Sequence, residues 1–75
     1  MNDMSAAPKA PRSRKVSAWR RYYETTACWY ADMAINLAEY PIASGYAQTE
    51  AERFRDGARE LRAGKHPNQI SGAWK

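Results

Sequence analysis

Apolar residues recur at intervals of three and four between positions 16 and 37, which is the spacing of one face of an α-helix. This stripe consists of Val16, Trp19, Tyr23, Tyr30, Met33 and Leu37, with Thr26 and Ala27 between its two halves. Pro41 lacks an amide hydrogen and disfavours helical geometry in Tyr40 before it. The pattern therefore predicts a helix over residues 16–40.

A second helix is predicted over residues 49–63. Ser44 and Gly45 lie in a segment, 41–48, that is rich in turn-forming residues and is expected to reverse the chain. Thr49 followed three residues later by Glu52 has the form of an N-terminal capping box. The apolar positions that repeat at helical spacing are Ala51, Phe54, Ala58 and Leu61, and Gly64 stands where a left-handed C-cap would end the helix.

The two ends of the chain have different patterns. Residues 1–15 contain two prolines and no apolar period, which predicts a flexible basic arm. Residues 65–75 contain Ile70 and Trp74 one helical turn apart, and we expect them to fold back as a short hydrophobic latch. The fold class is thus all-α, an antiparallel helical hairpin in a single domain over 16–75.

The apolar face of the predicted first helix is unusually wide. Tyr22, Trp29 and Tyr40 form a shoulder beside the stripe. The stripe and the shoulder together cover an arc of roughly 160° around the helix, whereas the apolar face of an ordinary surface helix covers about 100°. The predicted second helix offers only Phe54 and Leu61 as large apolar groups. We therefore expect a homodimer with a four-helix core, although the shoulder could instead contact another protein or remain half-exposed.

Composition limits the ways in which so small a chain can be stabilised. Among its 75 residues are one cysteine, Cys28, and one histidine, His66, so the chain can form no internal disulfide and lacks the ligands of a structural zinc site. Nothing resembles a signal peptide or a membrane span, so we expect a cytoplasmic protein without membrane insertion.

Catalysis is not expected. His66 falls in a predicted loop, and Cys28 projects near Glu24 and Asp32, whose carboxylates disfavour a reactive thiolate. The four glycines are isolated and match no phosphate-binding loop. One hairpin also cannot readily enclose a site from which water is excluded. We expect no catalytic residues, no metal and no cofactor.

Charge is segregated along the chain, although the net charge is only +4. Residues 1–21 carry six basic residues and one acidic residue, 22–50 carry four acidic residues and no lysine or arginine, and 51–75 carry six basic and three acidic residues. The first segment supplies the candidates for contact with nucleic acid: Lys9, Arg12, Arg14, Lys15, Arg20 and Arg21. The neighbouring Trp19, Tyr22 and Tyr23 could stack on exposed bases.

Three arginines of the second helix, Arg55, Arg59 and Arg62, share the flank of its apolar face. They could bind a carboxylate or phosphate of a partner. Alternatively, they pair with Glu52, Asp56 and Glu60 within one turn and form an ordinary solvated surface.

These features favour a small non-catalytic modulator, an inhibitor or adaptor that occludes a site on a larger protein or complex. Its expected contacts are Tyr22, Trp29, Tyr40, Arg55, Arg59 and Arg62. By analogy alone, a phage or mobile-element origin is compatible with such a protein. The first alternative is a nucleic-acid-binding regulator that uses the basic arm and the arginines, and the second is a structural subunit of a large assembly.

Overall fold

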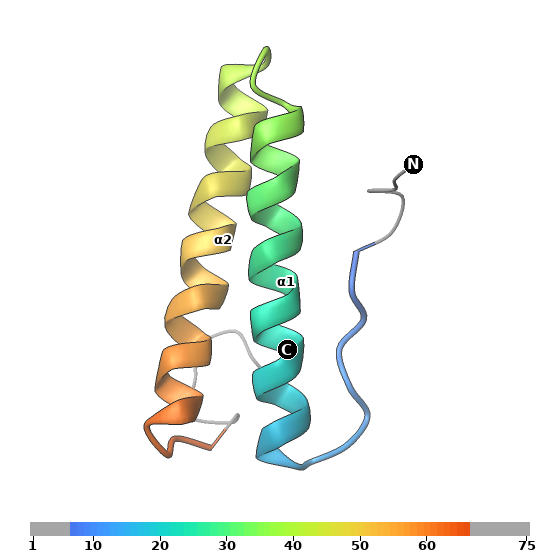
Figure 1. Ribbon diagram of the computed structural model, residues 1–75, viewed down its shortest axis with the longest axis vertical. Helices are drawn as coiled ribbons and strands as arrows, with labels where there is room; N and C mark the ends of the chain where they lie inside the picture. The colour runs from blue at the N-terminus through green and yellow to red at the C-terminus, as the bar shows by residue number, and fades with distance from the viewer. Residues whose placement is uncertain (1–6, 67–75) are drawn as a thin grey trace.

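The computed structural model describes residues 7–66, and it shows two helices packed as an antiparallel hairpin (Figure 1). Helix α1 spans Val16–Asn36 and helix α2 spans Pro41–Arg62. No strand occurs within the described residues. The predicted all-α hairpin is therefore confirmed, whereas the latch assigned to 65–75 lies almost wholly outside the described residues.

The boundaries between the helices differ from the prediction. Helix α1 ends at Asn36 rather than at residue 40, and α2 begins at Pro41 rather than at residue 49. Proline at the first position of a helix loses nothing by lacking an amide hydrogen, because that amide has no intrahelical acceptor. Pro41 therefore starts α2, whereas the prediction used it only to end the preceding helix.

The segment predicted as a turn is the first two turns of α2. The Ser44 hydroxyl donates a hydrogen bond of 2.9 Å to the carbonyl oxygen of Ala34, in the last turn of α1. This bond satisfies a carbonyl near the helix end, where intrahelical donors run out. Thr49 consequently lies on the exposed surface of a continuous helix, so the predicted capping box at Thr49 is wrong.

The C-terminal end of α2 agrees closely with the prediction. Gly64 has a φ of +108°, in the left-handed region that favours glycine. The amide of Lys65 donates to the Glu60 carbonyl at 3.1 Å, and the amide of Gly64 donates to the Leu61 carbonyl at 3.2 Å. These two bonds form a Schellman motif, which ends the helix at the predicted glycine.

The core lies along the seam between the helices and changes in character along its length. Towards the start of α1 it contains the large side chains of Trp19, Tyr23 and Leu61, all at most 4 % exposed. Towards the inter-helix turn it consists of small groups: Ala34, Ser44, Ala47 and Ala51. The predicted stripe is thus core at Trp19 and Tyr23, partly buried at Tyr30, Met33 and Leu37, and exposed at Val16.

Gly57 permits the closest approach within this seam. A Cβ atom at this position would overlap the ring of the buried Tyr23. The ring therefore occupies the space that any larger residue would fill, and α2 needs glycine here although glycine weakens a helix interior.

The two helices are nearly equal in length, at 21 and 22 residues. The expectation of a homodimer rested on a short second helix that could not cover the first, and that premise no longer holds. Dimerisation stays a prediction, which light scattering on the purified protein at micromolar concentration tests.

Candidate interaction surfaces at the two ends of the hairpin

The hairpin has two chemically distinct ends. We call the end where α1 turns into α2, residues 35–46, the tip. The opposite end, which we call the open end, brings together the start of α1 and the end of α2, and we include in it residues 7–15, which run back beside α1 (Figure 1).

The tip exposes large apolar side chains. Ile42 is 90 % exposed, and it is accompanied by Ile35 at 73 %, Tyr40 at 61 % and Tyr46 at 59 %. A shallow depression of about 470 Å³ is lined there by Tyr40, Pro41, Ile42 and Tyr46 together with Glu39 and Ala43. Clustered apolar groups at the surface of a small protein mark interaction sites more often than scattered ones do.

The charge of the tip is exclusively acidic. No lysine or arginine occurs between residues 22 and 52, whereas Glu39 and Asp32 are both exposed. Neither carboxylate forms an ion pair with a described residue. Glu39, which lines the depression, therefore places a negative charge at the edge of the apolar patch.

The predicted shoulder divides between two places. Tyr40 belongs to the tip, whereas Tyr22 and Trp29 are partly buried along one flank of the hairpin. Tyr22 meets Phe54 edge-on with ring centroids 6.0 Å apart, and Trp29 meets Tyr30 edge-on at 5.0 Å. The three residues of the shoulder thus do not form one continuous surface.

Phe54 joins the aromatic side chains of this flank across the helices. Its ring stacks on Tyr30 at 5.8 Å and meets the edge of Tyr23 at 5.1 Å. Burial raises the pKa of Tyr23 above its ordinary value of 10.0, and burial together with the neighbouring Tyr46 raises the pKa of Tyr30. The Trp29 indole N–H is buried and has no acceptor among the described residues.

The three arginines of α2 are all exposed, and two of them form ion pairs. Arg62 bonds to Glu24 across the helices, and Arg59 lies 3.2 Å from Asp56 on its own helix. Arg55 has no ion pair with a described acidic residue. Such exposed pairs contribute about 1 kcal/mol or less each, so they leave the arginines accessible to a partner.

The open end gathers the basic residues that were candidates for nucleic-acid contact. Lys9, Arg12, Arg14 and Lys15 lie before α1, and Arg20 and Arg21 lie in its first two turns. The Trp19 indole N–H donates to the Ser13 carbonyl at 2.8 Å, which ties the segment before α1 to the helix. Trp19 and Tyr23 are buried, so the predicted stacking of bases on these two rings is wrong, and only Tyr22 of the three is accessible.

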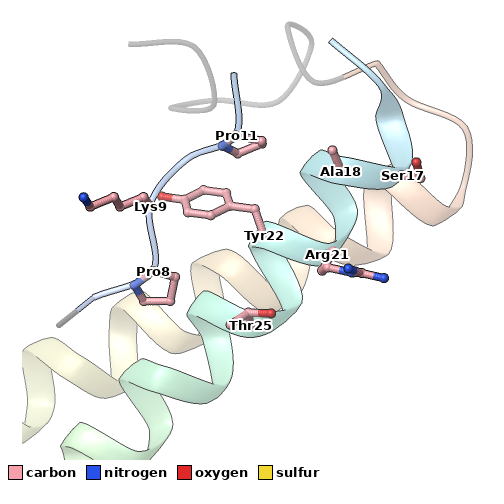
Figure 2. Close-up of a pocket in the computed structure, with 8 residues that line it drawn as sticks. All are labelled: Pro8, Lys9, Pro11, Ser17, Ala18, Arg21, Tyr22 and Thr25. Carbon is pink, nitrogen blue, oxygen red and sulfur yellow. The ribbon is translucent and has the colours of Figure 1, made fainter. Parts of the chain in front are cut away.

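A pocket of about 510 Å³ lies between this segment and the outer face of α1 (Figure 2). Pro8, Lys9 and Pro11 contribute from the segment, and Arg21, Tyr22 and Thr25 contribute from the helix. In Figure 2 the Tyr22 ring projects towards the segment between the two prolines, and Lys9 and Arg21 lie on opposite sides of it.

The structure does not bring the remaining candidate chemical groups together. Cys28 is exposed in the middle of α1, and His66 follows the end of α2. Among residues 7–66 no three potential metal ligands are grouped. Neither described helix is long and apolar enough to cross a bilayer.

Sequence reasoning missed Ile35, Ile42 and Tyr46 as surface residues. The available signal was the helical period itself, because Ile35 falls on the side of α1 opposite the apolar stripe. Ile42 and Tyr46 were not considered as surface residues of a helix, because residues 41–48 were predicted to form a turn.

Comparisons with protein-family models, with curated proteins and with solved structures found no match to this chain. Inference about its function therefore rests on the surfaces of the tip and the open end.

Proposed function

We propose that this protein is a small non-catalytic modulator, an inhibitor or adaptor, which docks its tip on a larger protein. The observation that carries the proposal is the exposure of Ile42, at 90 %, among three other exposed apolar side chains. Burying one such side chain is worth about 1.5–3 kcal/mol, a gain that the hairpin itself does not use.

The position of Ile42 supports a role outside the fold. It is the second residue of α2, and its side chain takes no part in the seam with α1, which is formed here by Ser44 and Ala47. A polar residue at position 42 would serve the helix equally well. Isoleucine is therefore better explained by contact with another molecule.

The apolar and acidic side chains of the tip indicate what kind of partner surface it would bind. Tyr40, Ile42 and Tyr46, the large apolar groups that line the depression, favour a hydrophobic groove. Glu39, which also lines it, and the exposed Asp32, one turn before the tip, favour lysine or arginine at the rim of that groove. Tyr40 and Tyr46 supply large contact area with few rotatable bonds, as interface anchors commonly do. The same acidic groups disfavour nucleic acid as the ligand of the tip.

Affinity capture from a source-cell lysate, with and without nuclease, tests this proposal. We expect the wild-type protein to retain one protein after nuclease treatment, and Ile42→Glu to lose it. The substitution should preserve the fold, because position 42 is exposed and a carboxylate in the first turn of a helix is favourable.

Thr49→Glu is the matched control, because it adds the same charge at an exposed position of α2 outside the tip. It should retain the captured protein. Equal capture by Ile42→Glu would overturn the tip as the docking surface. Recovery of many proteins without nuclease, together with no retained protein after nuclease treatment, would overturn the modulator itself.

A further inference from the structure

The open end has an excess of positive charge that the fold does not neutralise. Among the described residues, ion pairs join Glu24, Glu50, Asp56 and Glu60 to Arg62, Arg53, Arg59 and Lys65. No described acidic residue pairs with Lys9, Arg12, Lys15, Arg20, Arg21 or Arg55. Five of these cations, Lys9, Arg12, Lys15, Arg20 and Arg21, lie before α1 or in its first two turns, whereas the described tip carries no lysine or arginine, so positive charge is concentrated on this part of the described chain.

The pocket of the open end combines two kinds of chemistry. Its lining includes the Tyr22 ring and two prolines, which are apolar, and Lys9 and Arg21, whose charged ends point outward from the ring in opposite directions (Figure 2). At about 510 Å³ it is large enough to admit a planar ring system. An aromatic platform flanked by two cations fits a nucleotide within a strand, since each base is followed and preceded by a phosphate.

We infer that the open end binds a single strand of nucleic acid, with one base in the pocket against Tyr22 and the adjoining phosphates on Lys9 and Arg21. Arg12, Lys15 and Arg20 extend the phosphate contacts beyond the pocket. This site is independent of the tip, so the protein can hold a strand at one end and a protein at the other.

The pocket distinguishes a nucleic acid from an acidic protein surface. A row of carboxylates would satisfy the cations but would leave the apolar floor over Tyr22 unfilled. A base fills that floor and brings its own phosphates to the cations. The pocket also favours a single strand over a duplex, because a paired base lies within the helical stack and cannot enter it.

Fluorescence anisotropy with the full-length protein and labelled oligothymidylate tests the inference. We expect saturable binding at low salt, weaker binding to the matched duplex, and an affinity that falls steeply as salt is raised. Unlabelled polyglutamate and thymidine monophosphate serve as competitors. Neither should displace the strand at equal charge concentration, because the first lacks bases and the second lacks the extended phosphate chain.

Two sets of variants separate the charges from the ring. The double variant with Lys9→Gln and Arg21→Gln should have a shallower dependence of log affinity on log salt concentration. The magnitude of the slope should fall by about 0.7 for each phosphate that is no longer neutralised. The matched control, Arg53→Gln with Arg59→Gln, removes the same charge from residues that pair with Glu50 and Asp56, and should change the slope less. Tyr22→Leu should weaken binding about tenfold with a largely unchanged slope.

Tyr22 also packs on Phe54, so circular dichroism must show that the Tyr22→Leu variant is folded. The Tyr22→Phe variant keeps the ring and should bind the strand as the wild type does. No binding of either oligonucleotide at low salt would overturn the inference. Equal affinity for strand and duplex would overturn the base pocket, as would an unaffected Tyr22→Leu variant. Displacement by polyglutamate would identify an acidic protein as the ligand instead.

Discussion

The tip and the open end of the hairpin are built in opposite ways. At the open end, the large side chains of Trp19, Tyr23 and Leu61 lie inside, and charged groups cover the surface. At the tip, the interior consists of alanine and serine, and the large apolar groups lie outside. The open end therefore carries most of the hydrophobic stabilisation, whereas the tip places its apolar groups where another molecule can bury them.

This difference shows why hydrophobic content alone does not locate a core. Ile42 and Trp19 are both large and apolar, but Ile42 is 90 % exposed and Trp19 is 3 % exposed. Small residues at the seam near the tip leave no space between the helices for larger ones. Substitutions at each end test this difference.

The largest effect is expected from Trp19→Ala at the open end. Emptying a packed aromatic site costs about 3–5 kcal/mol, and this change also removes the hydrogen bond to Ser13. Trp29→Ala, which removes the same side chain from a partly buried position, should cost clearly less. Urea denaturation followed by circular dichroism measures both, and equal losses would show that the flank is as much a part of the core as Trp19.

The next largest effect is expected from Gly57→Ala, which forces a methyl group against the Tyr23 ring. Overpacking of this kind costs about 1–3 kcal/mol. Gly45→Ala is the control on the same helix, because nothing lies within 4 Å of its added Cβ. It should stabilise the protein by about 0.5–1 kcal/mol through its higher helix propensity. Thermal melts should move in opposite directions, and a stabilised Gly57→Ala variant would contradict the close approach.

At the tip, Ser44→Ala should cost about 1 kcal/mol by removing the hydrogen bond that the buried hydroxyl donates to Ala34. Ser17→Ala, on the exposed surface of α1, should have no comparable effect. Hydrogen exchange at the last turn of α1 measures the loss locally. Unchanged protection there in Ser44→Ala would show that the bond does not hold the tip.

The smallest effect concerns alkaline pH at the open end. Burial raises the pKa of Tyr23 above 10.0, so the unfolded chain releases this proton more readily than the folded chain does. The stability associated with neutral Tyr23 is fully present below about pH 10 and is lost as pH rises through the folded pKa. Tyr23→Phe should lessen this loss in denaturation experiments across that range. Identical alkaline losses in the variant and the wild type would contradict the assignment to Tyr23.

Much of the hairpin was determined by the sequence alone, because its signals are local. The spacing of Trp19 and Tyr23 specifies which face of α1 is buried, and Gly64 ends α2 through its own backbone conformation. The segregation of basic and acidic residues likewise indicated that charge divides along the molecule.

The position of the turn and the identity of the surfaces were decided by tertiary structure. Pro41 can end one helix or begin another, and Ser44 became helical where its hydroxyl meets the Ala34 carbonyl of the other helix. Because α2 begins at Pro41, Ile42 and Tyr46 lie on the exposed surface of the tip and not in the predicted turn. Antiparallel packing also brought Arg62 to Glu24 across the two helices, although these residues are 38 positions apart in sequence. Contacts between the helices determine where the turn lies and which residues are exposed, and the pattern of residues along one helix does not contain this information.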